Sequence, residues 1–296
     1  MSLGFQDLFG WKYLPHEIEK VAQKQKFYQM SSVGLQANEQ TTLLYKYVRD
    51  VFGSYIVRRQ GIGDCVSMGA AGAVDTLKAV QIALKNILGD FKTETCTEAI
   101  YALSRVEIGG GQLRGDDGSV GGWAAEAVKK YGTLCRDKYG KWDLTAYDAN
   151  RARAWGDSGL PDELEPIAHE HLVQTVTRCL SVQDVKANVT NGYPVTLASN
   201  QGFLTSRDKN GFSWPHDIWP HQMFINGYRN DIEGFCVQNS WGPEWISGPL
   251  ILDQPEGSFW ITGEVLNDIF NSGEADVWSY SSFDGYPPQK LDLRWV

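Results

Sequence analysis

The chain has 296 residues, of which 42% are hydrophobic and 12% aromatic, so it can bury a sizeable core and is not a disordered segment. Its formal net charge of −9 and its lack of basic runs argue against a nucleic-acid-binding surface. No stretch approaches the length of uninterrupted apolar sequence that a membrane-spanning helix needs, so we expect no membrane partner.

The N-terminal sequence and the cysteines indicate a compartment. The first twenty residues lack a basic region followed by an apolar stretch, so we expect no secretory signal and a cytoplasmic location. Five cysteines form an odd, sparse set, which indicates a reducing compartment with one special thiol and four core residues. His169 and His171 fall on different faces of an expected helix, which argues against a metal site there. We expect neither a metal nor a cofactor.

Helical periodicity dominates the first two thirds of the chain. The clearest case begins at Cys65 and continues to Leu88, with apolar residues at three- and four-residue steps and Gly89 as a stop. A further stretch closes at Asn191 and Gly192. We expect helices over residues 15–29, 41–57, 65–88, 123–131, 162–180 and 182–190.

The pattern changes after residue 192. Short apolar runs separated by Gly, Asn and Pro indicate strands. The expected strands cover residues 194–198, 222–228, 235–238 and 258–261. Helices first and strands later favour an α+β fold over alternating β-α-β units. We expect an N-terminal helical extension (1–54), a helical half (55–192), a β half (193–265) and a C-terminal tail (266–296).

Cys65 is the candidate nucleophile. It stands at the start of the strongest helix, where free backbone N–H groups and the helix dipole favour a thiolate. Gln60 lies five residues earlier, and its side-chain amide together with the Cys65 N–H is suited to form an oxyanion hole. These two residues predict a site for acyl transfer.

A histidine and an amide follow in the later part of the chain. His221 opens an apolar strand and is the candidate general base. Asn239 lies 18 residues further on, in the string NSWG, and is suited to orient the imidazole. Trp241 of the same string is expected to shield that hydrogen bond from water. His216 is the rival base, although its setting is that of a loop.

The ordered set of Gln60, Cys65, His221 and the NSWG string resembles papain-like cysteine peptidases. The resemblance covers roughly residues 55–265 and implies a helical half and a twisted antiparallel β half with the active-site cleft between them. It also implies a Cys-His-Asn triad that hydrolyses peptide bonds through an acyl-enzyme. A peptide or protein is the substrate that the resemblance implies.

Further residues carry the resemblance or depart from it. Gly121 and Gly122 resemble the Gly-Gly segment whose backbone pairs with an extended substrate. The loop before Cys65 is one residue shorter than is usual and lacks a cysteine. Asp64 stands where the family has a small neutral residue, and Val66 stands where it has an aromatic one. These differences indicate a divergent member with altered substrate pockets or slow turnover.

Two other functions stay open. The first is a peptidase-like fold that serves as a structural or assembly component, for example in a virus particle, a homo-oligomer or another large complex, with weak or no activity. The unusual loop around the thiol motivates it. The second is a cell-wall amidase, which shares Cys-His chemistry, but the chain has no wall-binding repeat or basic face.

Overall fold

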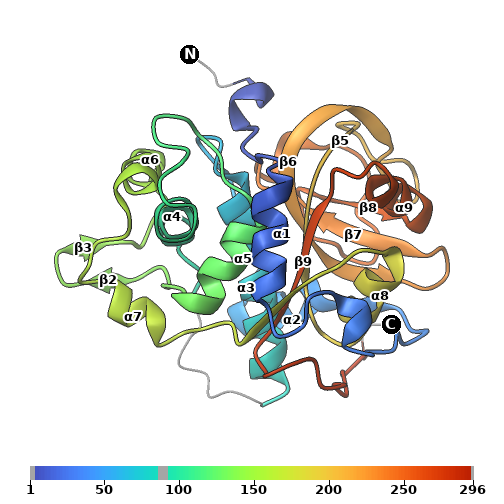
Figure 1. The fold of residues 1–296 in the computed structure, drawn as a ribbon. Helices are drawn as coiled ribbons and strands as arrows, with labels where there is room; N and C mark the ends of the chain where they lie inside the picture. The colour runs from blue at the N-terminus through green and yellow to red at the C-terminus, as the bar shows by residue number, and fades with distance from the viewer. Residues whose placement is uncertain (1–3, 86–92, 295–296) are drawn as a thin grey trace.

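The structure is a computed structural model that describes residues 4–85 and 93–294. Most helices gather on one side and an antiparallel sheet on the other, with α8 and α9 beside the sheet, as Figure 1 shows. The helices are α1 (Pro15–Lys24), α2 (Leu44–Phe52), α3 (Cys65–Ala83), α4 (Thr97–Ala102), α5 (Gly121–Lys130), α6 (Ala149–Ser158), α7 (Glu165–His169), α8 (Val182–Thr190) and α9 (Gly263–Asn271). None of the helices in this part of the chain is long and apolar enough to cross a membrane.

Seven strands form the main sheet, in the order β4-β9-β5-β6-β7-β8, with β1 also paired to β6. All of these pairs are antiparallel. The strands are β1 (Thr42–Leu43), β4 (Thr175–Arg178), β5 (Val195–Phe203), β6 (Pro215–Arg229), β7 (Gly234–Gln238), β8 (Ser258–Thr262) and β9 (Asp276–Ser281). A separate hairpin joins β2 (Lys138–Tyr139) to β3 (Trp142–Asp143). The α+β prediction is confirmed.

Small residues let α3 lie directly against β6. A Cβ atom at Gly72 would lie 2.2 Å from a ring carbon of Phe224, so only glycine permits this approach. Ala70, Ala71 and Ala73 are fully buried beside it. The core therefore runs between the first long helix and the middle of the sheet, and it fixes the start of α3 relative to β6.

One expected helix was wrong. Residues 162–180 form the short helix α7 and then the strand β4. The β-branched run from Thr175 to Thr177 suits an extended strand, and it pairs with β9 over Thr175–Arg178. The sequence analysis also missed α6, whose start is capped by the Asp148 carboxylate through the backbone N–H groups of Asn150 and Arg151.

Other expected boundaries shift. The first two helices are shorter than expected. The helix expected over 15–29 ends at Lys24, and the helix expected over 41–57 runs from Leu44 to Phe52. The α3 helix ends at Ala83, and the expected continuation through Leu88 to a stop at Gly89 lies outside the described residues. The expected C-terminal tail contains most of α9, which begins at Gly263, and the inner strand β9. The domain boundaries at 54, 192 and 265 stay predictions.

Candidate active site

The candidate nucleophile lies at the first residue of α3 and is fully buried. Its sulfur accepts a hydrogen bond of 3.4 Å from the backbone N–H of Gln222 on β6. Gln222 in turn fixes the start of α3, because its side-chain amide donates to the Val66 carbonyl over 2.8 Å. The thiol of Cys65 therefore faces β6 one residue from His221.

The predicted imidazole and amide are joined by a hydrogen bond. His221 Nε2 lies 2.7 Å from Asn239 Oδ1, and the same oxygen accepts from the Ser240 backbone N–H over 2.7 Å. Because a carbonyl oxygen can only accept, this arrangement places the imidazole proton on Nε2 and leaves a lone pair on Nδ1. Among the described residues, the buried Nδ1 has no hydrogen-bond partner.

Aromatic rings enclose this pair. The Trp241 ring centroid lies 4.6 Å from that of His221, and Trp219 lies 4.8 Å from Trp241. His221 is only 1% exposed. The rival His216 lies instead in the exposed part of β6, where its Nδ1 is 2.8 Å from Asp217. The geometry brings His221 and Asn239 together and leaves His216 outside this pair.

The Gln60 side chain is fully engaged. Its Nε2 donates to the carbonyl oxygens of Leu8 and Ile62, each over 2.8 Å. Its Oε1 accepts from the Ser240 hydroxyl over 2.7 Å. Both amide protons are therefore used in this state, one of them by a residue of the N-terminal segment.

This N-terminal segment, residues 4–13, lies across the candidate site. The Trp11 N–H donates to the Pro220 carbonyl over 3.1 Å, directly before His221. On the other side, the Ser119 N–H donates to the Gly10 carbonyl over 2.8 Å, and the Lys12 N–H donates back to Ser119 over 2.9 Å. Figure 1 shows the segment descending between the helices and the sheet before it enters α1.

The segment fits tightly over the loop that precedes Cys65. A Cβ atom at Gly10 would lie 1.8 Å from the Gly63 carbonyl oxygen. The Phe9 ring contacts Trp219 and Trp241, at centroid distances of 6.5 and 6.1 Å. After the short 3-10 helix Phe5–Leu8, the segment is therefore extended where it crosses the cleft, and it covers the buried Cys65 and His221.

The two glycines predicted to bind substrate lie next to this segment. Gly121 and Gly122 form the first turn of α5 and are buried. The backbone that pairs with the N-terminal segment is that of Ser119, two residues before Gly121. The Gly122 N–H donates instead to the Asp276 carboxylate over 3.2 Å.

Burial shapes the ionisation of the reacting groups. It raises the pKa of the Cys65 thiol to about 12, and the Asp64 carboxylate adds to this rise, whereas the Gln222 and Gly10 amides oppose it. It lowers the pKa of His221 to about 4, against the opposing effect of the Asn239 hydrogen bond. With the segment in place, both groups are therefore neutral near pH 7.

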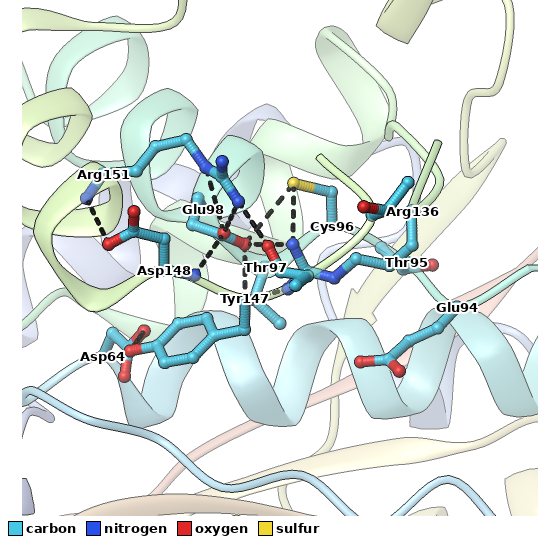
Figure 2. A network of polar contacts seen from close by, with 12 residues as sticks. Asp64, Glu94, Thr95, Cys96, Thr97, Glu98, Arg136, Tyr147, Asp148 and Arg151 are labelled. Atoms are coloured by element: carbon cyan, nitrogen blue, oxygen red, sulfur yellow. Dashed lines mark hydrogen bonds and ion pairs between the residues drawn. The ribbon is translucent and has the colours of Figure 1, made fainter. Parts of the chain in front are cut away.

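Asp64 is tied to a second polar cluster. Its Oδ2 accepts from the Tyr147 hydroxyl over 3.0 Å, and that hydroxyl accepts from the Gly61 N–H over 3.1 Å. Burial raises the pKa of Asp64 to about 8, and the Glu98 charge adds to the rise, although Tyr147 opposes it. Figure 2 shows Tyr147 between Asp64 and the buried Glu98, which Arg136 contacts at 2.6 Å.

The cysteines and acidic residues give no indication of a metal centre in the described part of the chain. All five cysteines are buried free thiols. Within residues 4–85 and 93–294, no group of three His, Cys, Asp or Glu side chains is placed to hold a metal ion.

Sequence reasoning missed the parts of the site that come from distant segments. Leu8 and Trp11 lie in the expected helical extension, and Asp276 in the expected tail, so the sequence predicts none of them as a site residue. The density of aromatic residues between positions 5 and 13 was the available signal for a buried segment. For Asp276 the sequence offers no comparable signal.

Solved structures share this fold. Xylellain, a cysteine protease from Xylella fastidiosa, superposes with a TM-score of 0.63 at 18% identity, over 96% of this chain and 100% of that one. Digestive procathepsin L 3 of Tenebrio molitor larval midgut gives 0.54 at 14% identity, over 94% and 77%. Procathepsin B S9 from Trypanosoma congolense gives 0.51 at 11% identity, over 95% and 85%.

These likenesses are structural, because the sequence itself matches no protein-family model and no curated protein. They extend over nearly the whole chain despite the low identity. The fold is therefore that of papain-like cysteine proteases.

Proposed function

We propose that the chain is a cysteine protease that hydrolyses peptide bonds and that residues 4–13 hold in a latent state. The single observation that carries the proposal is an extended peptide bound across Cys65 by backbone hydrogen bonds to Pro220 on one side and Ser119 on the other. A cleft that binds one extended peptide in this way is suited to bind another. The hydrogen bond between His221 and Asn239 beside this peptide supports the proposal of a cysteine protease.

In the open cleft, His221 Nδ1 takes the proton from the Cys65 thiol. The thiolate attacks the carbonyl carbon of the substrate, and the C–S bond forms as the carbonyl electron pair moves to oxygen. The Gln60 amide and the Cys65 backbone N–H stabilise this oxyanion. The C–N bond then breaks, and the imidazolium gives its proton to the leaving amine.

Water completes the cycle. His221 takes a proton from a water molecule, which attacks the thioester carbonyl and releases the acid product and the thiol. Asn239 keeps the imidazole in the required tautomer throughout, since its Oδ1 holds Nε2–H. Besides this water, the cycle uses side chains and backbone groups of the chain.

Latency follows from the same contacts. The N-terminal segment occupies the Gln60 donor through Leu8, and it buries the thiol and the imidazole, so both stay neutral. An ion pair between them needs an environment that favours charge. Departure of the segment, by displacement or by cleavage, is therefore the activating step.

Hydrolysis of a mixed fluorogenic peptide pool tests the proposal. We expect turnover from a full-length chain whose segment is destabilised by Gly10→Ala, and none when Cys65→Ala is added. Turnover that persists in the Cys65→Ala chain would refute the assignment. A folded Gly10→Ala chain with an accessible thiol and no turnover would refute it as well.

A structural role in a particle or complex is the second candidate. The observation that favours it is the complete burial of Cys65, together with 1% exposure of His221. This role predicts that the segment stays in place in the assembled state and that Cys65→Ala leaves assembly unchanged. Co-purification of the chain in a stoichiometric complex with Cys65 still protected would support it.

A further inference from the structure

The Trp11 side chain occupies a buried pocket next to the candidate nucleophile. It is only 2% exposed, and its Nε1 donates to Asp276 Oδ2 over 3.2 Å. Its neighbour Gly10 contributes a backbone amide to the surroundings of the Cys65 sulfur. The pocket therefore receives the side chain one residue away from the backbone that crosses the thiol.

Asp276 is the acidic residue of this pocket. The first residue of β9, it is fully buried, and its carboxylate also accepts from Trp278 Nε1 over 2.6 Å and from the Gly122 N–H over 3.2 Å. These partners are neutral donors. Burial raises the pKa of Asp276, and the three donors oppose the rise, as does the charge of Arg178 on β4.

Removal of the segment takes one of these donors away. Asp276 then keeps the hydrogen bonds from Trp278 and Gly122, but its Oδ2 no longer accepts one from the Trp11 indole. A buried carboxylate that loses a hydrogen-bond donor is unfavourable unless a new donor or a cation arrives. An aliphatic side chain in the pocket would cover the carboxylate without supplying either.

We infer that, once the segment has left, this pocket selects a substrate side chain that carries an N–H donor, with arginine and lysine favoured over aliphatic residues, and that Asp276 is the residue that sets this preference. The inference rests on the proposed function, because it names the substrate class of the same cleft. A site built to hydrogen-bond one group rejects analogues that lack it, since its own polar group is left unpaired.

The full-length chain allows a test that needs no catalysis. Position 11 is varied, and the rate at which iodoacetamide labels Cys65 is followed by intact mass and peptide mapping, as a measure of how often the segment leaves. We expect Trp11→Leu to label about tenfold faster than the unmodified chain, and Trp11→Arg to stay within roughly threefold of it. Equal rates for the Arg and Leu substitutions would overturn the inference.

The same two substitutions of Trp11 in an Asp276→Asn chain test the role of the Asp276 carboxyl group. With Asp276→Asn in place, we expect the protection that Trp11→Arg has over Trp11→Leu to disappear. Tyr13→Phe is the matched control, because it removes another hydrogen bond of the same segment, 2.6 Å long, to the Gly273 carbonyl. Its effect should be the same in both backgrounds. If the Arg advantage survives Asp276→Asn, Asp276 does not set the preference.

A failure of the inference and a failure of the proposed function give different results. If Asp276→Asn fails to fold, the comparison of Trp11→Arg with Trp11→Leu in the natural background still decides the inference. Peptide libraries with the Gly10→Ala chain then extend it to substrates: faster cleavage with Arg or Lys at one position supports it, and an aliphatic preference at every position overturns it. Absence of all cleavage contradicts the proposed function, whereas the labelling series still decides the pocket's preference.

Discussion

The Leu8 carbonyl oxygen accepts a 2.8 Å hydrogen bond from the side-chain amide of Gln60. The amide that the sequence predicts for an oxyanion is thus bound to a carbonyl of the chain's own N-terminal segment. This contact joins a predicted catalytic side chain to the N-terminal segment that covers the site. A change in the segment should therefore alter the reactivity of the Cys65 thiol.

Gly10→Ala should open the cleft. The added Cβ would lie 1.8 Å from the Gly63 carbonyl, a distance that no packing tolerates, so the segment must shift. We expect iodoacetamide to label Cys65 at least about tenfold faster than in the unmodified chain, since one serious clash outweighs a few hydrogen bonds.

Gly4→Ala is the matched control for that variant. It lies in the same segment at a φ of −77°, and the nearest atom to its added Cβ is 3.8 Å away. Its labelling rate should equal that of the unmodified chain. If Cys65 in Gly10→Ala is labelled as slowly as in the unmodified chain, close packing at Gly10 does not hold the N-terminal segment in place.

Gln60→Ala should impair turnover without hiding the thiol. In the Gly10→Ala background, loss of the amide donor is expected to lower kcat by about 10²–10³, while Cys65 labelling stays as fast. Ser240→Ala removes only the hydroxyl that donates to Gln60 Oε1 and should have a smaller effect. An unchanged kcat in Gln60→Ala would show that this amide does not stabilise the oxyanion.

The order of motifs along the chain was enough to predict part of this site. Cys65 at a helix start, and the NSWG string after an apolar strand, are local patterns, and the change from helices to strands predicted the fold class. The hydrogen bond from Gln60 to Leu8 could not be predicted from the sequence, because it uses a backbone carbonyl that every residue has. Trp11 and Asp276 meet across 265 positions, with no local pattern to link them.

The same limit explains the errors in secondary structure. The sheet takes β4 from a region that sequence reasoning assigned to a helix, because four residues are too few to outweigh the helical periodicity before them. Pairing with β9, a hundred residues later, stabilises that strand. Tertiary contacts decide such short elements.

Asp64 should give stability an unusual dependence on pH. Its pKa is raised to about 8 in the folded chain, against about 3.9 when unfolded, so the folded state holds the extra proton between these values. Its contribution to stability therefore falls as pH rises through this range. His221, with its pKa lowered to about 4, has the opposite effect up to about pH 6.5 and offsets Asp64 there.

The comparison of Asp64→Asn with the unmodified chain isolates the Asp64 effect, because the other titrating groups are common to both proteins. The free energy of unfolding of Asp64→Asn, relative to the unmodified chain, should therefore rise by about 2 kcal/mol between pH 6.5 and 8. Urea unfolding at the two pH values measures this difference. Parallel pH dependence of the two proteins would show that Asp64 is not protonated in the folded chain.

Glu98 should be important for stability. Its fully buried carboxylate contacts Arg136 at 2.6 Å and Arg151 at 2.7 Å, as Figure 2 shows. Glu98→Ala leaves two partly or wholly buried guanidinium groups without it, which typically costs about 3–5 kcal/mol. Chemical denaturation checks this. Glu163→Gln, which breaks an exposed pair with Lys141, is the control and should leave the unfolding midpoint unchanged.

The most direct test of a latent cysteine protease is labelling by an epoxysuccinyl peptide at neutral pH, read by intact mass. The unmodified chain should react slowly, and the Gly10→Ala chain should gain one adduct on Cys65 far faster than a simple thiol does. Adding Cys65→Ala should abolish the adduct. A folded Gly10→Ala chain whose Cys65 reacts with iodoacetamide but not with the epoxysuccinyl peptide would contradict an activated thiol in a peptide-binding cleft.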